Sequence, residues 1–453
     1  MAAKQDHIHE LEKRLDDFNP QVRFNSLLEL KALMDEGKII PQKMQPIANL
    51  HCHTFFSYNA YGYSPTKLAW IAKRMGIKYI GIVDFDVIDG VDEFLQACEI
   101  ICVRGSAGIE TRVYIPEFSK LVINSPGEPG ISYHMGIGFT SSQAPESVAG
   151  MLNEFRQRAD LRNRSMMRRL NDYLHPLHID YDSEVLPSTP ASTATERHMI
   201  AKIVQKAQET LPSPIDFWVE KLKTDRNTII QKNEKPQVFK NFARAKLMKR
   251  GGIGYVQLKP ELFPIVEDFH HVIEECGALP CATWLDGTSQ GEQAIEDLLG
   301  LLIEKGLAAI NIIPDRNWDI DDPEIKKVKL KNLYQVVELA DKLNLPINIG
   351  TEMNSFGQKL VDDFNVKELA PVRDSFLRGA DFIYGHMQMG RNLKMGYQSV
   401  WAKKYLPSRR ERNVFFEEAG KAIPPDKKGR AILGQINASQ SPAVILEKLK
   451  SNL

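Results

Sequence analysis

Short apolar runs alternate with amphipathic helical segments in two parts of the chain, residues 46–144 and 265–390. This alternation of strands with helices indicates parallel strands joined by crossover helices. Residues 1–45, 145–264 and 391–453 instead carry helical periodicity or polar, basic stretches. The pattern predicts an α/β protein in which a helical insertion interrupts the strand-bearing part, with helical extensions at both ends.

The predicted strands of the second part end in polar residues. Strands are expected over 278–283, 307–313 and 345–350. The polar residues that follow them are Asp286, Asp315, Arg316, Asn317, Glu352 and Asn354. A parallel barrel builds its site at the carboxyl ends of its strands, so the pattern indicates a site at that edge.

A histidine pair, His51 and His53, lies at the end of the first apolar run. On a strand, alternate side chains point to the same face, so both imidazoles would project to one side of the sheet. Two neutral imidazoles on one face are a common beginning of a zinc, manganese or iron site. Two surface or capping histidines explain the pair equally well, but an acidic strand end at Asp84 favours the site.

Composition narrows the classes of function. The 453 residues carry 58 basic and 58 acidic side chains, so no net charge favours nucleic acid or a membrane surface. No apolar run approaches the roughly 20 residues that cross a bilayer, and no secretory signal is visible. The five scattered cysteines fit a reducing, cytoplasmic compartment. Serine-hydrolase, helix-turn-helix and zinc-finger motifs are absent from the sequence.

Several segments carry a further pattern in their order along the chain. They are residues 49–54, 72–76, 80–86, 108–110, 134–138, 277–286 and 350–354. In that order they resemble the motifs D-L-H-x-H-T, A-x-x-x-G, I-x-I-T-D-H-D, G-x-E, H-x-L-G-Y, G-x-x-x-x-A-H-P and G-S-D-x-H of the PHP (polymerase and histidinol phosphatase) superfamily. The resemblance covers residues 46–390 and implies an irregular (β/α)7 TIM-like barrel with metal-dependent phosphoesterase activity.

The predicted insertion carries the same resemblance. Residues 162–167 and 197–201 resemble the Arg-x-x-R-x-x-x-M and R-P-H-[IL]-A segments of PHP nucleotide and oligonucleotide phosphatases. Substrate contacts are therefore expected from Arg164, Arg197 and His198, as parts of an electropositive lid for a phosphorylated molecule. A solvated helix face for the arginines and a packing role for His198 are the alternatives.

The resemblance also implies a set of metal ligands. The residues at the positions of the family's first metal site are His51, His53, Glu110 and Glu352. All four can bind a metal, although Glu352 stands where the family has an aspartate. His134 matches a ligand of the second site and would serve as a fifth ligand or as the acid/base.

At the other ligand positions of the family, this sequence carries residues that do not bind metal well. The A-H-P histidine is replaced by Thr283 or Trp284. The third-site positions hold Asn59 or a nearby residue, Phe85 and Asn354. Phe85 would fill the third-metal space with apolar surface rather than leave an empty polar cavity. The pattern predicts one divalent ion, which would be zinc, manganese or iron.

Asp84 has two interpretations. As a buried carboxylate after a strand, it would act as a general base or orient a ligating histidine. Alternatively, it caps the amino end of the following helix.

We therefore expect a cytoplasmic, metal-dependent hydrolase of PHP type, a phosphoesterase acting on a small phosphorylated metabolite or nucleotide. Phosphate ester hydrolysis usually profits from a second cation, so two alternatives stay open. One is a catalytically inactive PHP-derived binding or scaffold protein, and the other is a mononuclear amidohydrolase-like enzyme. Neither a membrane nor sequence-specific nucleic acid is an expected partner, and the sequence makes no prediction of the oligomeric state.

Overall fold

The computed structural model describes residues 2–257 and 259–451 and contains one seven-stranded sheet, in the order β1-β2-β3-β4-β5-β6-β7. The strands are β1 Gln45–Cys52, β2 Ile77–Phe85, β3 Arg104–Tyr114, β4 Ile131–Ile137, β5 Leu279–Trp284, β6 Ala309–Ile312 and β7 Ile347–Ile349. A bridge between Cys52 and Glu352 brings β1 beside the chain that follows β7. The sheet therefore forms a nearly closed barrel, which confirms the predicted TIM-like α/β fold.

One strand departs from the expected parallel arrangement. β4 is antiparallel to both β3 and β5, whereas the other neighbouring strands are parallel. β3 and β4 follow each other without an intervening α-helix, so the chain returns along the sheet instead of crossing over it. The register of β4 with β3 and β5 decides which of its side chains reach the barrel interior.

Local sequence signals set the first barrel helix, α3 Pro65–Met75. The Ser64 side chain accepts a hydrogen bond from the Lys67 amide, and Pro65 occupies the first turn. Gly76 ends the helix with a left-handed φ of 68°, where a Cβ would also meet the backbone of Lys43. These signals lie within a few residues of the helix, so the local sequence sets both of its ends.

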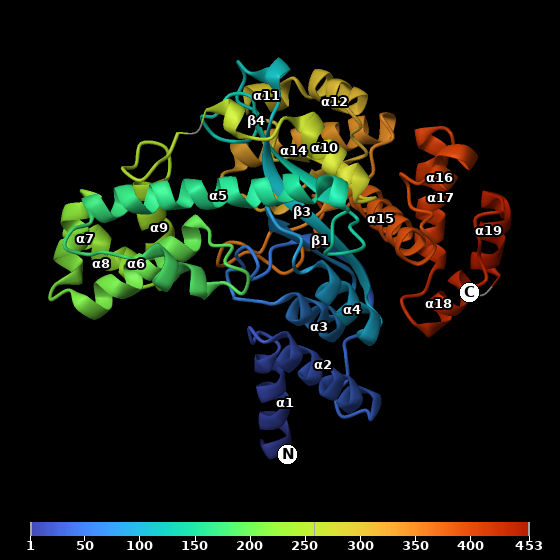
Figure 1. The fold of residues 1–453 in the computed structure, drawn as a ribbon, viewed down its shortest axis with the longest axis horizontal. Coiled ribbons are helices and arrows are strands. Elements are labelled where there is room, and N and C mark those ends of the chain that lie inside the picture. The colour runs from blue at the N-terminus through green and yellow to red at the C-terminus, as the bar shows by residue number, and fades with distance from the viewer. Residues whose placement is uncertain (1, 258, 452–453) are drawn as a thin grey trace.

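Helices cover the outside of the sheet, as Figure 1 shows. Those between or after the strands are α3, α4 Val91–Ile101, α10 Val266–Glu275, α11 Gln290–Gln293, α12 Ile295–Glu304, α13 Asp315–Trp318, α14 Pro323–Lys342 and α15 Arg373–Leu393. Their apolar side chains pack with those of the strands into one hydrophobic core, which contains Trp70, Phe94, Phe269, Leu333 and Phe376. This burial holds the strand ends, and the polar residues on them, in fixed positions.

The segment between β4 and β5 forms a helical lobe beside the barrel (Figure 1). Its helices are α5 Glu146–Tyr173, α6 Glu196–Thr210, α7 Pro214–Leu222, α8 Arg226–Asn233 and α9 Pro236–Met248. They surround a separate hydrophobic cluster that includes Leu170, Ile203, Trp218 and Phe239. The long helix α5 runs from the barrel into the lobe (Figure 1). The lobe is thus able to present side chains toward one end of the barrel.

Further helices at both ends of the chain pack on the barrel core. They are α1 Ala2–Arg14, α2 Pro20–Asp35, α16 Val400–Tyr405, α17 Arg409–Ala422, α18 Lys427–Leu433 and α19 Pro442–Lys450. Leu11 of α1, Leu15 just after this helix and Phe416 of α17 join the same core cluster as the strands. The predicted helical extensions are therefore confirmed.

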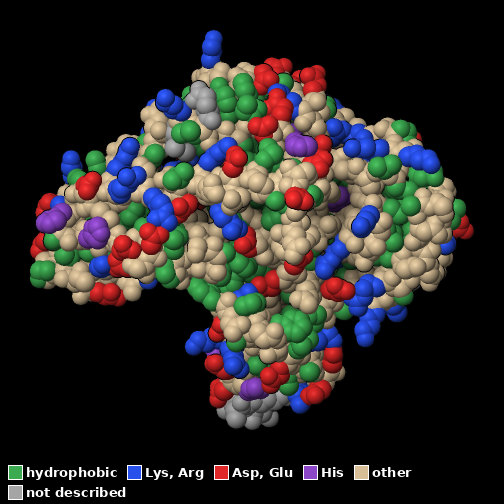
Figure 2. Space-filling model, viewed as in Figure 1, with side chains coloured by type: hydrophobic (Ala, Val, Ile, Leu, Met, Phe, Trp, Pro, Cys, Tyr) green, Lys and Arg blue, Asp and Glu red, His purple; other side chains and the backbone are tan. Residues whose placement is uncertain are grey.

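The visible surface carries no extended area of one charge. Figure 2 shows Lys and Arg side chains interspersed with Asp and Glu side chains over this face. Within the described residues, no helix combines the length and the apolar character that a transmembrane span requires.

Candidate metal centre

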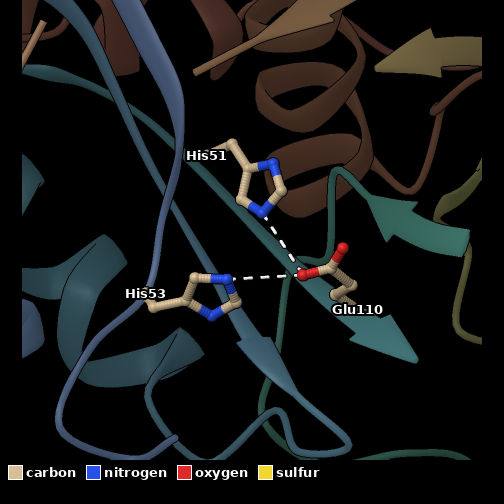
Figure 3. A group of neighbouring side chains, drawn as sticks. All are labelled: His51, His53 and Glu110. Atoms are coloured by element: carbon tan, nitrogen blue, oxygen red, sulfur yellow. Dashed lines mark ion pairs between the residues drawn. The ribbon is translucent and has the colours of Figure 1, made fainter. Parts of the chain in front are cut away.

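Three buried side chains meet where β1 ends, beside Glu110 within β3 (Figure 3). Glu110 Oε2 lies 3.4 Å from His51 Nε2 and 3.3 Å from His53 Nε2. One potential ligand atom from each residue lies within 4.8 Å of the others. The register of β2 with β3 places Glu110 opposite Phe85, at the end of β2, so the parallel strands carry the cluster to one edge of the barrel.

The cluster fits a divalent metal. His51 Nδ1 and Nε2, His53 Nε2 and Glu110 Oε2 are buried without a hydrogen-bond partner among the described residues. Buried polar atoms in native proteins almost always have a partner, so their grouping at one point calls for a shared one. Two imidazoles and a carboxylate suit zinc, manganese or iron, and three protein ligands leave a coordination position for water or substrate.

The electrostatics of the cluster keep the carboxylate in its ligating form. Burial raises the pKa of Glu110, but the close approach and charge of His51 and His53 outweigh burial and lower the pKa to about 2. Burial lowers the pKa of His51, whereas the neighbouring Glu110 raises it, and the net direction is upward. A buried anion between two imidazoles is therefore the resting arrangement of this chain.

Asp84 holds one side of the cluster in place. Its carboxylate accepts hydrogen bonds from the Thr54 amide at 2.7 Å, the Thr54 hydroxyl at 2.6 Å and the Ser57 hydroxyl at 2.5 Å. Ser57 Oγ in turn lies 3.2 Å from His53 Nδ1, which leaves Nε2 directed at Glu110. The helix-cap interpretation of Asp84 is wrong, because α4 begins after Gly90 and Asp84 bonds to the loop that follows β1.

Phe85 lies directly against this histidine. The rings of Phe85 and His53 are stacked, with centroids 4.2 Å apart and an interplanar angle of 23°. The apolar face restricts rotation of the imidazole. Asp84 and Phe85 thus orient His53 from two consecutive positions of the β2 end.

The structure does not bring His134 into the cluster. In the antiparallel pairing of β3 with β4, Thr111 stands opposite His134 and Glu110 stands opposite Met135. Because neighbouring residues of a strand point to opposite faces, His134 points away from the face that carries Glu110. Its Nε2 lies 2.8 Å from Nε2 of His270 on α10. The expected ligand or acid/base role of His134 is corrected to a packing contact outside the barrel.

Replacing His134 by glutamine is expected to leave metal binding unchanged and to destabilise the fold by about 1–3 kcal/mol, because a buried polar contact to His270 is lost. Burial, followed by the charge of His270, lowers the pKa of His134 well below its ordinary value. The unfolded chain therefore takes up a proton near pH 6.5 that the folded chain does not. The stability of the wild type should fall relative to the variant between pH 7 and 5, at up to about 1.4 kcal/mol per pH unit.

Urea denaturation at the two pH values and metal analysis of both proteins check this result. Loss of metal in the glutamine variant would contradict the corrected placement of His134.

Glu352 lies beside the cluster but its carboxylate is already engaged. Glu352 Oε2 is 2.8 Å from Nη2 of Arg316, and it also accepts a hydrogen bond from Gln358 Nε2 at 3.3 Å. Its charge still acts on His51. Metal ligation by Glu352 therefore stays a prediction. It requires that the carboxylate either breaks its contact with Arg316 or binds Arg316 and the metal at the same time. The sequence placed Arg316 among the polar strand ends but assigned it no role.

The three expected substrate residues have different surroundings. Arg197 donates hydrogen bonds to Ser355 Oγ at 2.6 Å and Asn241 Oδ1 at 3.0 Å, and it lines the cavity described below. Arg164 instead pairs with Asp160 and Asp182 and is not among the cavity residues.

His198 belongs to a helix cap. Its Nδ1 accepts a hydrogen bond from the Thr195 amide, 3.1 Å away, as part of the capping box of α6. Burial lowers the pKa of His198 to about 4, so the ring is neutral at pH 7. The structure therefore favours the packing alternative for His198 and the solvated-face alternative for Arg164.

A cavity of about 690 Å³ lies between the barrel mouth and the helical lobe, and Glu110 forms part of its wall. Cationic side chains outnumber acidic ones along it. The cationic residues are Arg112, Arg156, Arg158, Arg162, Arg197, Arg244, Lys249, Arg250 and Arg316, and the acidic residues are Asp86, Glu110, Glu128, Asp160, Glu196 and Glu352. Most of these residues carried no signal in the sequence, because lobe and barrel contribute to the cavity from distant positions.

Comparisons with known proteins give distant likenesses. No family model and no curated protein matches the chain. One similar solved structure is an amidohydrolase from Chromobacterium violaceum with bound sulfate, at 17% identity and a TM-score of 0.47, covering 70% of this chain and 91% of that one. Another, from Bifidobacterium adolescentis, is provisionally assigned as a metal-dependent phosphoesterase, at 18% identity and a TM-score of 0.45, covering 73% and 97%. The PHP resemblance of the motifs thus stays a prediction, on a fold that is an α/β barrel.

Proposed function

We propose that this protein is a metal-dependent hydrolase that cleaves phosphate esters of small molecules. The observation that carries the proposal is the His51, His53 and Glu110 cluster at the wall of a cavity rich in cations. One bound zinc, manganese or iron ion would supply Lewis acidity and a water of lowered pKa.

The cavity suits an anionic ligand. The pKa of Arg162 is lowered by burial and by the nearby charge of Arg112, and its Nε has no hydrogen-bond partner among the described residues. Burial also lowers the pKa of Lys249. Cations that repel one another in a poorly solvated space are stabilised when an anion enters. This favours a phosphorylated substrate over a neutral amide.

In the proposed reaction, the residues of the chain would bind the substrate and orient the metal ligands. A water oxygen forms a bond to phosphorus, the ester P–O bond breaks, and the proton that the water gives up passes to the departing alkoxide oxygen. Asp84, through Ser57, keeps His53 Nε2 directed to the metal position. The arginines of the cavity wall would pair with the negative charge of the phosphate group. The volume of the cavity limits the substrate to small molecules that fit beside Glu110.

An assay of phosphate release tests this proposal. Protein loaded with zinc, manganese or iron is expected to hydrolyse p-nitrophenyl phosphate or a member of a panel of nucleotides and sugar phosphates, and chelator-treated protein should not. Simple amides serve as the comparison. Metal binding with hydrolysis of amides alone would favour the amidohydrolase alternative. Absence of both metal and turnover would favour a scaffold protein.

A further inference from the structure

We propose that Arg316 is a substrate-binding residue of this site, whose guanidinium binds a phosphoryl oxygen beside the His51, His53 and Glu110 cluster. The inference rests on the proposed function and deepens it, because it assigns a second cation to a centre with a single metal position.

The position of Arg316 follows from the end of β6. The short helix α13 begins directly after this strand, and Arg316 is its second residue. Its guanidinium binds the carboxylate of Glu352 at 2.8 Å, and the charge of Glu352, with a smaller contribution from Glu110, raises its pKa. The guanidinium is therefore charged and adjacent to a predicted metal ligand.

Glu352 fixes the guanidinium to the same strand end that carries the histidines. The Glu352 amide donates to the His51 carbonyl oxygen and the His53 amide donates to the Glu352 carbonyl oxygen, both at 2.8 Å. Glu352 also has a left-handed φ of 63°, which a non-glycine residue adopts only where its surroundings require it. These contacts set the carboxylate, and with it Arg316, at a defined place beside the cluster.

Most of the donors of Arg316 have no hydrogen-bond partner among the described residues. A guanidinium carries five N–H groups, and the hydrogen bond to Glu352 uses one. No other acceptor among the described residues binds its side chain, which is 42% exposed and lies in the cavity wall. Arg197, in contrast, already donates to Asn241 and Ser355. Arg316 thus combines a fixed position with N–H groups available to a ligand.

Phosphoryl chemistry matches this geometry. A planar guanidinium binds two oxygens of one phosphate group through parallel charge-assisted hydrogen bonds. The non-bridging oxygens of the phosphate group carry negative charge, and where only one metal is bound a second cation is needed to neutralise it. The guanidinium of Arg316 would supply this second positive charge from a side chain held by Glu352.

Titration of metal-loaded protein with inorganic phosphate, followed by calorimetry, tests the proposal. Arg316→Gln should bind the same amount of metal as the wild type and bind phosphate roughly 10- to 150-fold more weakly, the effect of losing hydrogen bonds to a charged group. Arg316→Lys keeps the positive charge but loses the planar guanidinium that binds two oxygens at once. Its affinity for phosphate should therefore lie between those of the wild type and Arg316→Gln.

Arg378→Gln is the matched control. Arg378 pairs with Asp341 at 3.0 Å on the surface and its side chain is 43% exposed, close to the exposure of Arg316. Its replacement should leave phosphate affinity unchanged. If Arg316→Gln and Arg316→Lys bind phosphate as the wild type does, Arg316 only neutralises Glu352 and the proposal is overturned. Loss of metal from both variants overturns it as well, since Arg316 would then support the metal ligands. A wild type without metal or phosphate binding would instead refute the proposed function itself.

Discussion

Replacing Glu110 by glutamine is expected to weaken divalent-metal binding at the barrel mouth by more than about 100-fold. Glu110 Oε2 lies 3.4 Å from His51 Nε2 and 3.3 Å from His53 Nε2. Glutamine has the same size, so no void forms, but its amide carries no charge to attract the ion. Loss of a partner outside the direct ligands already costs about 10- to 100-fold in metal affinity, and a direct ligand should cost more.

Metal analysis and thermal unfolding together measure this effect. The wild type at a metal concentration of about 100 Kd should gain roughly 2.7 kcal/mol of stability, and the glutamine variant should gain little at the same concentration. Glu99→Gln is the control, because Glu99 pairs with Arg430 on the surface away from the cluster. Equal metal content and equal stabilisation in Glu110→Gln and wild type would show that these three side chains do not form the metal site.

Replacing Gly385 by alanine is expected to destabilise the protein by about 3 kcal/mol or more. Gly385 lies in α15 where this helix crosses α17, and a Cβ there would collide with the carbonyl oxygen of Phe416 and the amide of Gly420. Overpacking usually costs about 1–3 kcal/mol, and here the obstacle is backbone, which cannot adopt another rotamer. The better helix propensity of alanine returns only about 1 kcal/mol.

Gly150→Ala is the matched control for this prediction. Gly150 also lies within a helix, α5, but a Cβ there would meet no atom within 4 Å. Its replacement should stabilise the protein by about 0.5–1 kcal/mol, because glycine in a helix costs conformational entropy. The midpoints of thermal unfolding should therefore shift in opposite directions. Equal midpoints in the two variants would show that α15 and α17 can separate at low cost.

Much of the fold could be predicted from local patterns. The β-α alternation predicted an α/β protein with parallel strands, and the motif resemblance implied the barrel. Local signals at Ser64, Pro65 and Gly76 set the bounds of α3. The spacing of His51 and His53 predicted that both imidazoles would face one side. These features depend on residues close together in the chain, so their physical causes are visible in the sequence.

The pairing register of β4 could not be read in the same way. A strand shows the same apolar run whichever of its residues pairs with Glu110, and this register decides which side chains of β4 lie on the face of Glu110. His134 therefore matched a family motif by position but packs against His270 on the outside. His270, an unremarkable helix residue in the sequence, is its partner.

The sequence by itself thus determined the elements, their order and the histidine pair, because capping, periodicity and strand alternation act over a few residues. The motif resemblance also implied that Glu110 joins the pair and that the insertion supplies cations, and the structure brings Glu110 beside the two histidines. Only the tertiary structure decided that Arg316 binds Glu352 and that His134 packs against His270. Those contacts join residues far apart in the chain, and they exist only when burial of the apolar core closes the sheet into a barrel.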